Sequence, residues 1–108
     1  MGEEHRKAKR FRVNLPARWE GLRARDRGTI SDLSLTGCFV LTAGRTGRGE
    51  PVRLAMQLPG GVHLSLGAEV VYYTEEIGFA VRFTTGEAAD KRQLAAFLKK
   101  KQAEEGDA

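Results

Sequence analysis

The sequence has little of the side-chain chemistry that enzymes use. Its 108 residues include one cysteine, Cys38, and two histidines, His5 and His63. Positions 5, 38 and 63 lack the spacing of metal ligands, so no metal site is predicted. Neither histidine has an evident carboxylate or serine partner for acid–base or nucleophilic catalysis. We therefore expect a binding protein rather than an enzyme.

Long apolar runs are also missing. No stretch approaches the roughly 20 residues that a membrane-spanning helix needs, and the N-terminus has no signal-peptide pattern. A single cysteine cannot form an internal disulfide, and Cys38 stands in an apolar run where we expect it to be buried. These absences favour a cytoplasmic protein without a membrane span.

Positive charge is distributed unevenly. The formal net charge is +4, and nine of the 18 Lys and Arg residues lie between Arg6 and Arg27, accompanied only by Glu20 and Asp26. Such a field favours an anionic partner, such as a nucleotide, a nucleic acid or an acidic membrane. The alternative is a basic face that only keeps the domain soluble.

The pattern of apolar residues predicts a mainly β domain. We expect residues 1–10 to form a flexible basic arm, residues 11–103 to form the folded domain, and residues 104–108 to fray. Period-two alternation predicts six strands, at about 12–20, 26–33, 37–42, 52–58, 62–70 and 77–83. So small a sheet protects its edges best by closing, which predicts a six-stranded antiparallel (split) β-barrel.

The period becomes helical after Gly86, which predicts a C-terminal α-helix on the barrel or over one mouth. Its first turn would hold Glu87 and Asp90, and its last turn the lysines 99–101, as the helix dipole favours. The segment "AGRTGRGEP", residues 43–51, matches no nucleotide-binding glycine pattern and precedes no helix. We expect it to be a hairpin loop between the third and fourth strands.

Two polar segments carry the candidate site. The first is "RKAKR", residues 6–10, which holds Arg6 and Arg10. The planar fork of arginine can clamp phosphate or pair with the O6 and N7 edge of guanine. The second is "SDLSLTGC", residues 31–38, which interrupts the apolar pattern with Asp32, Ser34 and Gly37.

The second segment offers complementary chemistry. Asp32 can accept from the N1–H and amino group of guanine, Ser34 can donate or accept, and Gly37 permits a close approach. Ile30 and Leu33 cannot both face the core from one regular strand, so a bulge or a strand end is expected near Asp32. The alternative is a turn whose Asp and Ser side chains bond to their own backbone.

Together the segments form R-x-x-x-R followed by D-x-S-x-x-G within a barrel pattern, which resembles the PilZ domain. The resemblance covers nearly the whole chain and includes "RFRVNLPARW" and "IGFAVRF". PilZ domains are bacterial receptors for cyclic di-GMP. The resemblance implies that Arg6 and Arg10 bind guanine and phosphate, and that Asp32, Ser34 and Gly37 form the barrel side of the pocket. It implies no other cofactor.

The resemblance implies a receptor or adaptor that relays the level of this second messenger to an unidentified effector protein, in biofilm or motility regulation. We expect the ligand to order the arm over the barrel. His5 stands where relatives that bind a stacked ligand pair often have arginine, which slightly favours one ligand per protomer over two.

Two alternatives remain. A small basic barrel could bind RNA or single-stranded DNA. The aromatic residues, however, mostly stand at positions whose alternation faces the core, which disfavours base stacking. A PilZ-like adaptor could also act through protein contacts without the nucleotide.

Overall fold

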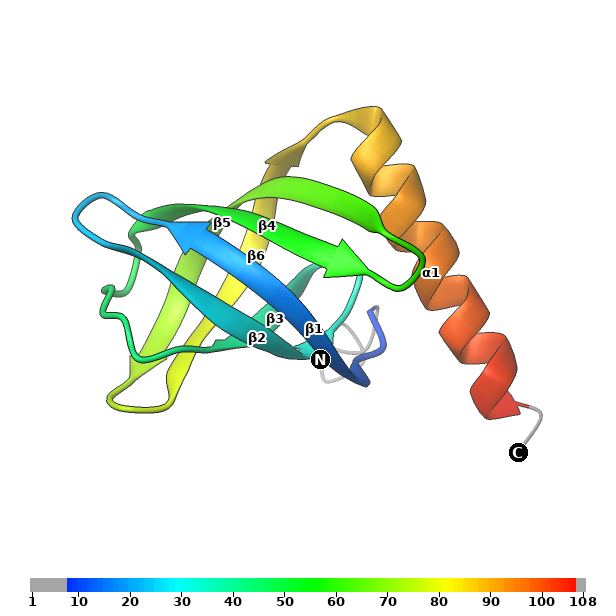
Figure 1. The fold of residues 1–108 in the computed structure, drawn as a ribbon, viewed down its shortest axis with the longest axis horizontal. Coiled ribbons are helices and arrows are strands. Elements are labelled where there is room, and N and C mark those ends of the chain that lie inside the picture. The colour runs from blue at the N-terminus through cyan, green and yellow to red at the C-terminus, as the bar shows by residue number, and fades with distance from the viewer. Residues whose placement is uncertain (1–7, 107–108) are drawn as a thin grey trace, which may run out of the picture.

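The computed structural model describes residues 8–106, which form a β-barrel and one helix. The elements are β1 (Phe11–Glu20), β2 (Arg25–Leu33), β3 (Gly37–Leu41), β4 (Pro51–Leu58), β5 (Val62–Thr74), β6 (Gly78–Gly86) and α1 (Ala88–Gly106). Antiparallel pairing closes the barrel in the order β1-β2-β3-β6-β5-β4 (Figure 1). The predicted six-stranded antiparallel barrel with a C-terminal helix is therefore confirmed.

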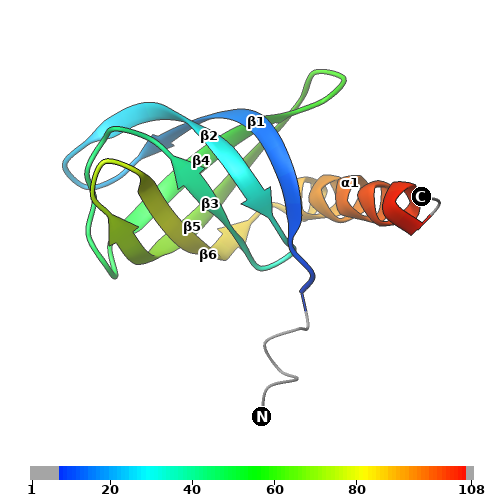
Figure 2. The same ribbon diagram turned by 90° about the horizontal axis from the view of Figure 1, so that it is seen from below.

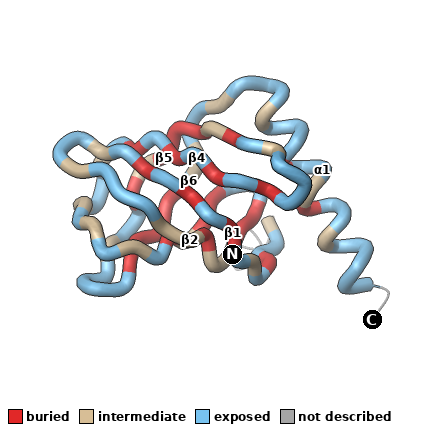
Figure 3. The backbone as a smooth tube through the Cα atoms, in the orientation of Figure 1, coloured by how far each residue is buried: buried red, intermediate tan, exposed pale blue. Residues whose placement is uncertain are grey.

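The side chains that alternation predicts to face inward fill the barrel. Along β4, exposed and buried residues alternate without interruption, and Figure 3 shows the same alternation of colour on the strands. Trp19 and Phe79 meet in the core with ring centroids 5.0 Å apart, in an edge-to-face arrangement. Cys38 is fully buried, as expected, and this burial raises the pKa of its thiol.

β2 departs from regular pairing beside the second motif. Its register with β3 shifts between Ile30 and Asp32. Ile30 and Leu33 are both fully buried. Residues three apart on a regular strand face opposite sides, but the extra residue of the bulge brings both side chains to the same face. The bulge predicted near Asp32 is therefore confirmed, and it turns Asp32 toward the outer surface.

The segment between β3 and β4 is not a hairpin, so that prediction is wrong. β3 pairs with β2 and β6, whereas β4 pairs with β1 and β5, and two strands separate them in either direction around the barrel. The carboxylate of Glu50 holds this crossing segment in place, because it accepts from the amides of Leu22 at 2.7 Å and Gly47 at 3.2 Å. These bonds, chiefly the one from Leu22, lower the pKa of Glu50.

Helix α1 lies against one end of the barrel (Figures 1 and 2), where Leu94 and Leu98 join the core cluster. It continues to Gly106, beyond the predicted boundary at residue 103, and its last turn holds no basic residue. The lysines at 99–101 therefore do not occupy the last turn, contrary to the prediction. Within residues 8–106, no helix is long and apolar enough to span a bilayer.

Candidate functional site

The predicted site residues that the structure describes gather at the end of the barrel next to α1. Asp32 lies near the end of β2, Ser34 in the β2–β3 turn and Gly37 at the start of β3. Arg10 precedes β1, and its guanidinium Nη1 contacts Asp32 Oδ1. Arg6 belongs to residues 1–7, which lie outside the described part of the chain. The structure thus joins the second arginine of the first motif to the aspartate of the second.

Asp32 presents its carboxylate at the surface between two arginines. Besides the contact with Arg10, it stands directly opposite Arg12 on β1. The side chain of Asp32 is 34% exposed and that of Arg10 is 52% exposed. An ion pair this accessible contributes only about 0–1 kcal/mol to stability. Both groups can therefore exchange partners at little cost.

The hydroxyl of Ser34 has a different environment, because it is 1% exposed and bonds within its own turn. Its Oγ accepts from the amides of Thr36 at 3.1 Å and Gly37 at 3.2 Å, and it donates to the carbonyl of Gly37 at 3.3 Å. Ser34 therefore bonds to the backbone of its own turn, as the alternative interpretation of this motif expects. Asp32 does not, because its carboxylate pairs with Arg10. Ligand contact by Ser34 stays a prediction.

Gly37 allows β3 to approach β6 closely. A Cβ at this position would lie 2.1 Å from the carbonyl oxygen of Val81 on β6, which is far inside van der Waals contact. The group that approaches Gly37 closely is therefore a neighbouring strand, and a close approach by a ligand stays a prediction. Gly37 thereby fixes the position of the β2–β3 turn relative to β6.

Beside Asp32 lies an aromatic pair that the sequence pattern does not predict. Asp32 stands opposite Phe39 on β3, and Phe39 and Tyr72 flank Ala80 on β6. The two rings lie 6.1 Å apart, and Tyr72 is 51% exposed. The available signal was the alternation along β3, since Cys38 and Val40 both face inward and leave Phe39 on the outer face. These two aromatic residues therefore lie on the outer face of the barrel and not in its core.

This surface carries groups whose chemistry complements that of a guanine nucleotide. A carboxylate can accept from the N1–H and amino group of guanine, and a guanidinium can donate to its O6 and N7 edge or to a phosphate. An exposed ring offers a face on which a base can stack. Among residues 8–106, no group of three or more His, Cys, Asp and Glu side chains is placed to hold a metal ion.

Solved structures with the same fold are found at low sequence identity, whereas no curated protein matches the chain. The Bacillus subtilis inhibitor of motility, MotI/DgrA, has 19% identity and a TM-score of 0.77, over 91% of this chain and 51% of that one. The chain thus spans about half the length of that protein. The PilZ domain of CeSA from a cellulose-synthesizing bacterium has 17% identity and a TM-score of 0.68, over 87% of this chain and 98% of that one.

The sequence itself establishes the family. A model of the PilZ domain matches residues 4–100, a range that contains both motifs, from Arg6 to Gly37. PilZ domains form a family of cyclic di-GMP receptors and adaptors, in agreement with the barrel and with the solved structures that resemble it. The chain belongs to the PilZ domain family.

Proposed function

We propose that this protein is a cyclic di-GMP receptor whose site consists of Arg6, Arg10, Asp32, Ser34 and Gly37. One observation carries the proposal: the guanidinium of Arg10 reaches the carboxylate of Asp32 across 22 positions of sequence. Neither residue is needed for the core, since both side chains are partly exposed. Their meeting places a donor fork and a carboxylate together at the surface, as a guanine nucleotide requires.

Ligand binding proceeds by exchange of partners in this proposal. A guanine offers its N1–H and amino group to Asp32, and the released guanidinium of Arg10 pairs with a phosphodiester or with the O6 and N7 edge. The two negative charges of the ligand meet Arg10 and Arg12, which lie beside Asp32. Phe39 and Tyr72 supply ring faces next to the same carboxylate.

Ser34 and Gly37 act mainly as supports of this site. The buried hydroxyl of Ser34 binds the amides of its turn, and Gly37 lets β3 pack against β6. Both hold the end of β2 at a fixed place on the barrel, so that Asp32 faces the arm. This division of roles explains why a polar motif interrupts two apolar strands.

The signal is relayed through residues 1–10, which the anionic ligand draws onto the barrel. Arg6, Lys7, Lys9, Arg10 and Arg12 concentrate positive charge that Asp32 and Glu105 neutralise only in part, and the phosphates of the ligand supply the remaining negative charge. Lys9 lies 3.2 Å from Glu105 of α1, so movement of the arm also reaches the helix. The rearranged arm and helix end form the face that an effector protein binds. The name of MotI and the source of the CeSA domain direct the search for this effector to motility and to surface polysaccharide synthesis.

Calorimetric titration with cyclic di-GMP tests the proposal, with GMP and a short oligonucleotide as comparison ligands. We expect cyclic di-GMP to bind the full chain and GMP and the oligonucleotide to bind far more weakly. The stoichiometry decides between one and two ligands per protomer. Binding of the oligonucleotide alone would indicate a nucleic-acid-binding barrel, and no binding of any ligand would indicate an adaptor that acts through protein contacts.

Hydrogen exchange tests the relay separately. The amides of residues 5–10, which precede β1, are expected to gain protection when cyclic di-GMP is added, because the negative charge of the ligand adds contacts with the arginines of the arm. Arg10→Ala is expected to reduce this gain in protection. Arg48→Ala is the matched control, since both variants remove an exposed arginine. Protection that is equal with and without ligand would place the relay in another part of the molecule.

A further inference from the structure

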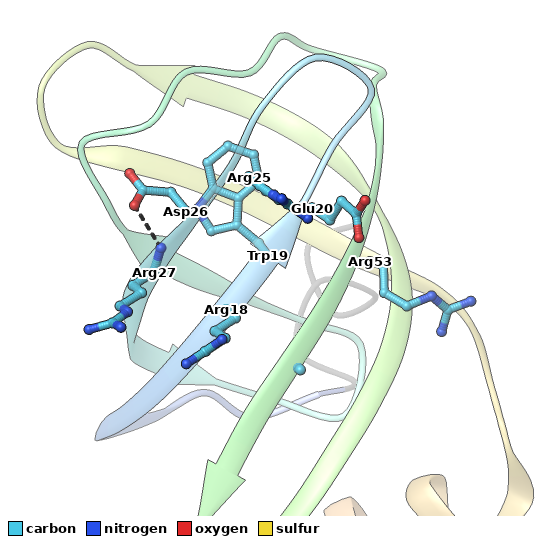
Figure 4. Close-up of a pocket in the computed structure, with 8 residues that line it drawn as sticks. Arg18, Trp19, Glu20, Arg25, Asp26, Arg27 and Arg53 are labelled. Atoms are coloured by element: carbon cyan, nitrogen blue, oxygen red, sulfur yellow. Dashed lines mark hydrogen bonds between the residues drawn. The ribbon is translucent and has the colours of Figure 1, made fainter.

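The outer face of β4, β1 and β2 carries four arginines in two neighbouring rows. One row places Arg53, Glu20 and Arg25 side by side, and the next places Ala55, Arg18 and Arg27 side by side. We call Arg18, Arg25, Arg27 and Arg53 the arginine face. They line a hollow of about 600 Å³, shown in Figure 4, which includes none of the predicted nucleotide-site residues.

The charge of the arginine face is poorly neutralised. Within residues 8–106, none of its arginines forms an ion pair, whereas Arg10, Arg45 and Arg82 each do. Arg18 and Arg27 stand directly opposite each other, and like charges in such a position destabilise a strand pair. In Figure 4 both side chains extend toward the same side of the sheet. The chain keeps this repulsion at a cost to stability, which points to a role in binding an anion.

Two carboxylates line the hollow, but they leave a positive excess. Glu20 stands between Arg25 and Arg53, and one oxygen of Asp26 accepts from the amide of Arg27 at 2.8 Å. Four arginines and two carboxylates leave a formal charge of +2 around the hollow. An anionic partner therefore finds guanidinium groups that lack a carboxylate of their own.

We propose that the arginine face is a docking surface for an extended acidic segment of a partner protein. Alternate side chains of an extended chain recur about every 6.6–6.8 Å, which is also the distance between rows two residues apart on β1. A segment with a carboxylate at every second residue therefore matches both rows. Guanidinium forks bind carboxylates through paired hydrogen bonds, which favours arginine over lysine for this contact.

The inference goes beyond the proposed nucleotide site and does not depend on it. Arg18 lies six positions after Arg12 on β1, which separates the two sites by about 20 Å of strand. The partner segment and the nucleotide therefore occupy different ends of the same strand. Both can bind at once, and β1 connects them.

The observations favour an acidic protein segment over nucleic acid. Single-stranded nucleic acids bind proteins largely by stacking bases on exposed aromatic rings. The one aromatic residue that lines the hollow, Trp19, is only 2% exposed.

Titration of the ¹⁵N-labelled full chain by NMR tests the inference. The probe is a blocked peptide of roughly eight residues that alternates Glu and Ser, long enough to cross both rows when extended. A Gln–Ser peptide and an oligothymidine of similar length are the comparison ligands. We expect amide shifts centred on the arginine face with the Glu–Ser peptide, and weaker binding as salt concentration rises. Tighter binding of oligothymidine, or shifts spread over the whole surface, would overturn the inference.

Variants distinguish binding at the arginine face from a general effect of net charge on peptide affinity. Arg18→Gln with Arg27→Gln is expected to weaken peptide binding about tenfold or more, since each charge-assisted contact is worth more than 1 kcal/mol. Arg48→Gln with Arg92→Gln removes the same charge elsewhere, and should change binding less than about twofold. Arg18→Lys with Arg27→Lys keeps the charge without the fork and is expected to give an intermediate loss. Equal losses of affinity in the two Gln double variants would overturn the inference. Arg10→Ala changes only the proposed nucleotide site, so it should leave peptide binding unchanged. This result is expected whether or not the protein binds cyclic di-GMP.

Discussion

The guanidinium of Arg10 contacts the carboxylate of Asp32, and this pair joins the base of the N-terminal arm to the bulge of β2. No other contact among residues 8–106 links the two motifs by side-chain hydrogen bonding. Since both side chains are partly exposed, the pair adds little to the free energy of unfolding. Both groups therefore remain accessible and can exchange partners.

Replacement of Asp32 tests this separation of binding from stability. We expect Asp32→Ala to lower the affinity for cyclic di-GMP roughly 10- to 150-fold, which corresponds to a charge-assisted contact of about 1.5–3 kcal/mol. The free energy of unfolding should change by less than about 1 kcal/mol. Calorimetry and a urea melt measure the two quantities. Asp26→Ala is the matched control, because it removes an exposed carboxylate beyond the site; cooperative unfolding of Asp32→Ala would show a structural role instead.

Ser34 should behave in the opposite way. Ser34→Ala removes a buried acceptor from the amides of Thr36 and Gly37, and it is expected to lower the free energy of unfolding by about 1–3 kcal/mol. Urea denaturation of this variant beside Ser31→Ala, which lies on the half-buried part of β2, measures the difference. A loss of cyclic di-GMP affinity with unchanged stability would show that the hydroxyl acts on the ligand.

Two glycines offer a matched pair. Gly37→Ala introduces a Cβ that would lie 2.1 Å from the carbonyl of Val81, whereas a Cβ at Gly47 meets nothing within 4 Å. We expect Gly37→Ala to lower the free energy of unfolding by about 1–3 kcal/mol, as overpacked sites do, and Gly47→Ala to have little effect. Thermal melts compare the two. Equal stability would mean that β3 and β6 separate without cost.

Period-two alternation predicted most of the barrel because it reports which face of a strand is buried. It could predict the bulge at Asp32, since Ile30 and Leu33 both had to be buried. It does not report which strands pair. It therefore predicts a hairpin at residues 43–51, where the chain instead crosses to a distant strand. The helix end was misplaced for a related reason: the Gln, Ala and Glu residues after the lysines also favour helix.

The site was predictable only at the level of residue type. A serine in a polar motif can bind a ligand or bond to its own turn, and only the burial of Ser34 separates the two roles. Phe39 and Tyr72 come together through pairing of β3, β6 and β5. They are far apart along the chain, so no local pattern connects them.

Acid should weaken the fold through Glu50. Its pKa is lowered from the ordinary value of 4.5, chiefly by the bond from the Leu22 amide, so the folded protein holds this proton less tightly than the unfolded chain. The stabilisation is present above the unfolded pKa and is lost as pH falls through the folded pKa. The difference in free energy of unfolding between the native protein and Glu50→Gln should therefore shrink below about pH 4.5. Urea melts from neutral to acidic pH measure it, and a constant difference would contradict the assignment.

The strand register of the arginine face predicts the sign of the change in stability when an arginine is replaced by glutamate. Arg27→Glu places a carboxylate opposite Arg18 and should raise the free energy of unfolding by about 0.2–1 kcal/mol, because it replaces repulsion with attraction. Arg25→Glu makes the same change in net charge but places a carboxylate opposite Glu20, so it should lower stability by a similar amount. Urea melts at low salt distinguish the two, and shifts of the same sign would show that total charge outweighs register. If Arg27→Glu stabilises the barrel and also abolishes binding of the Glu–Ser peptide, then arginine at this position lowers stability and serves binding.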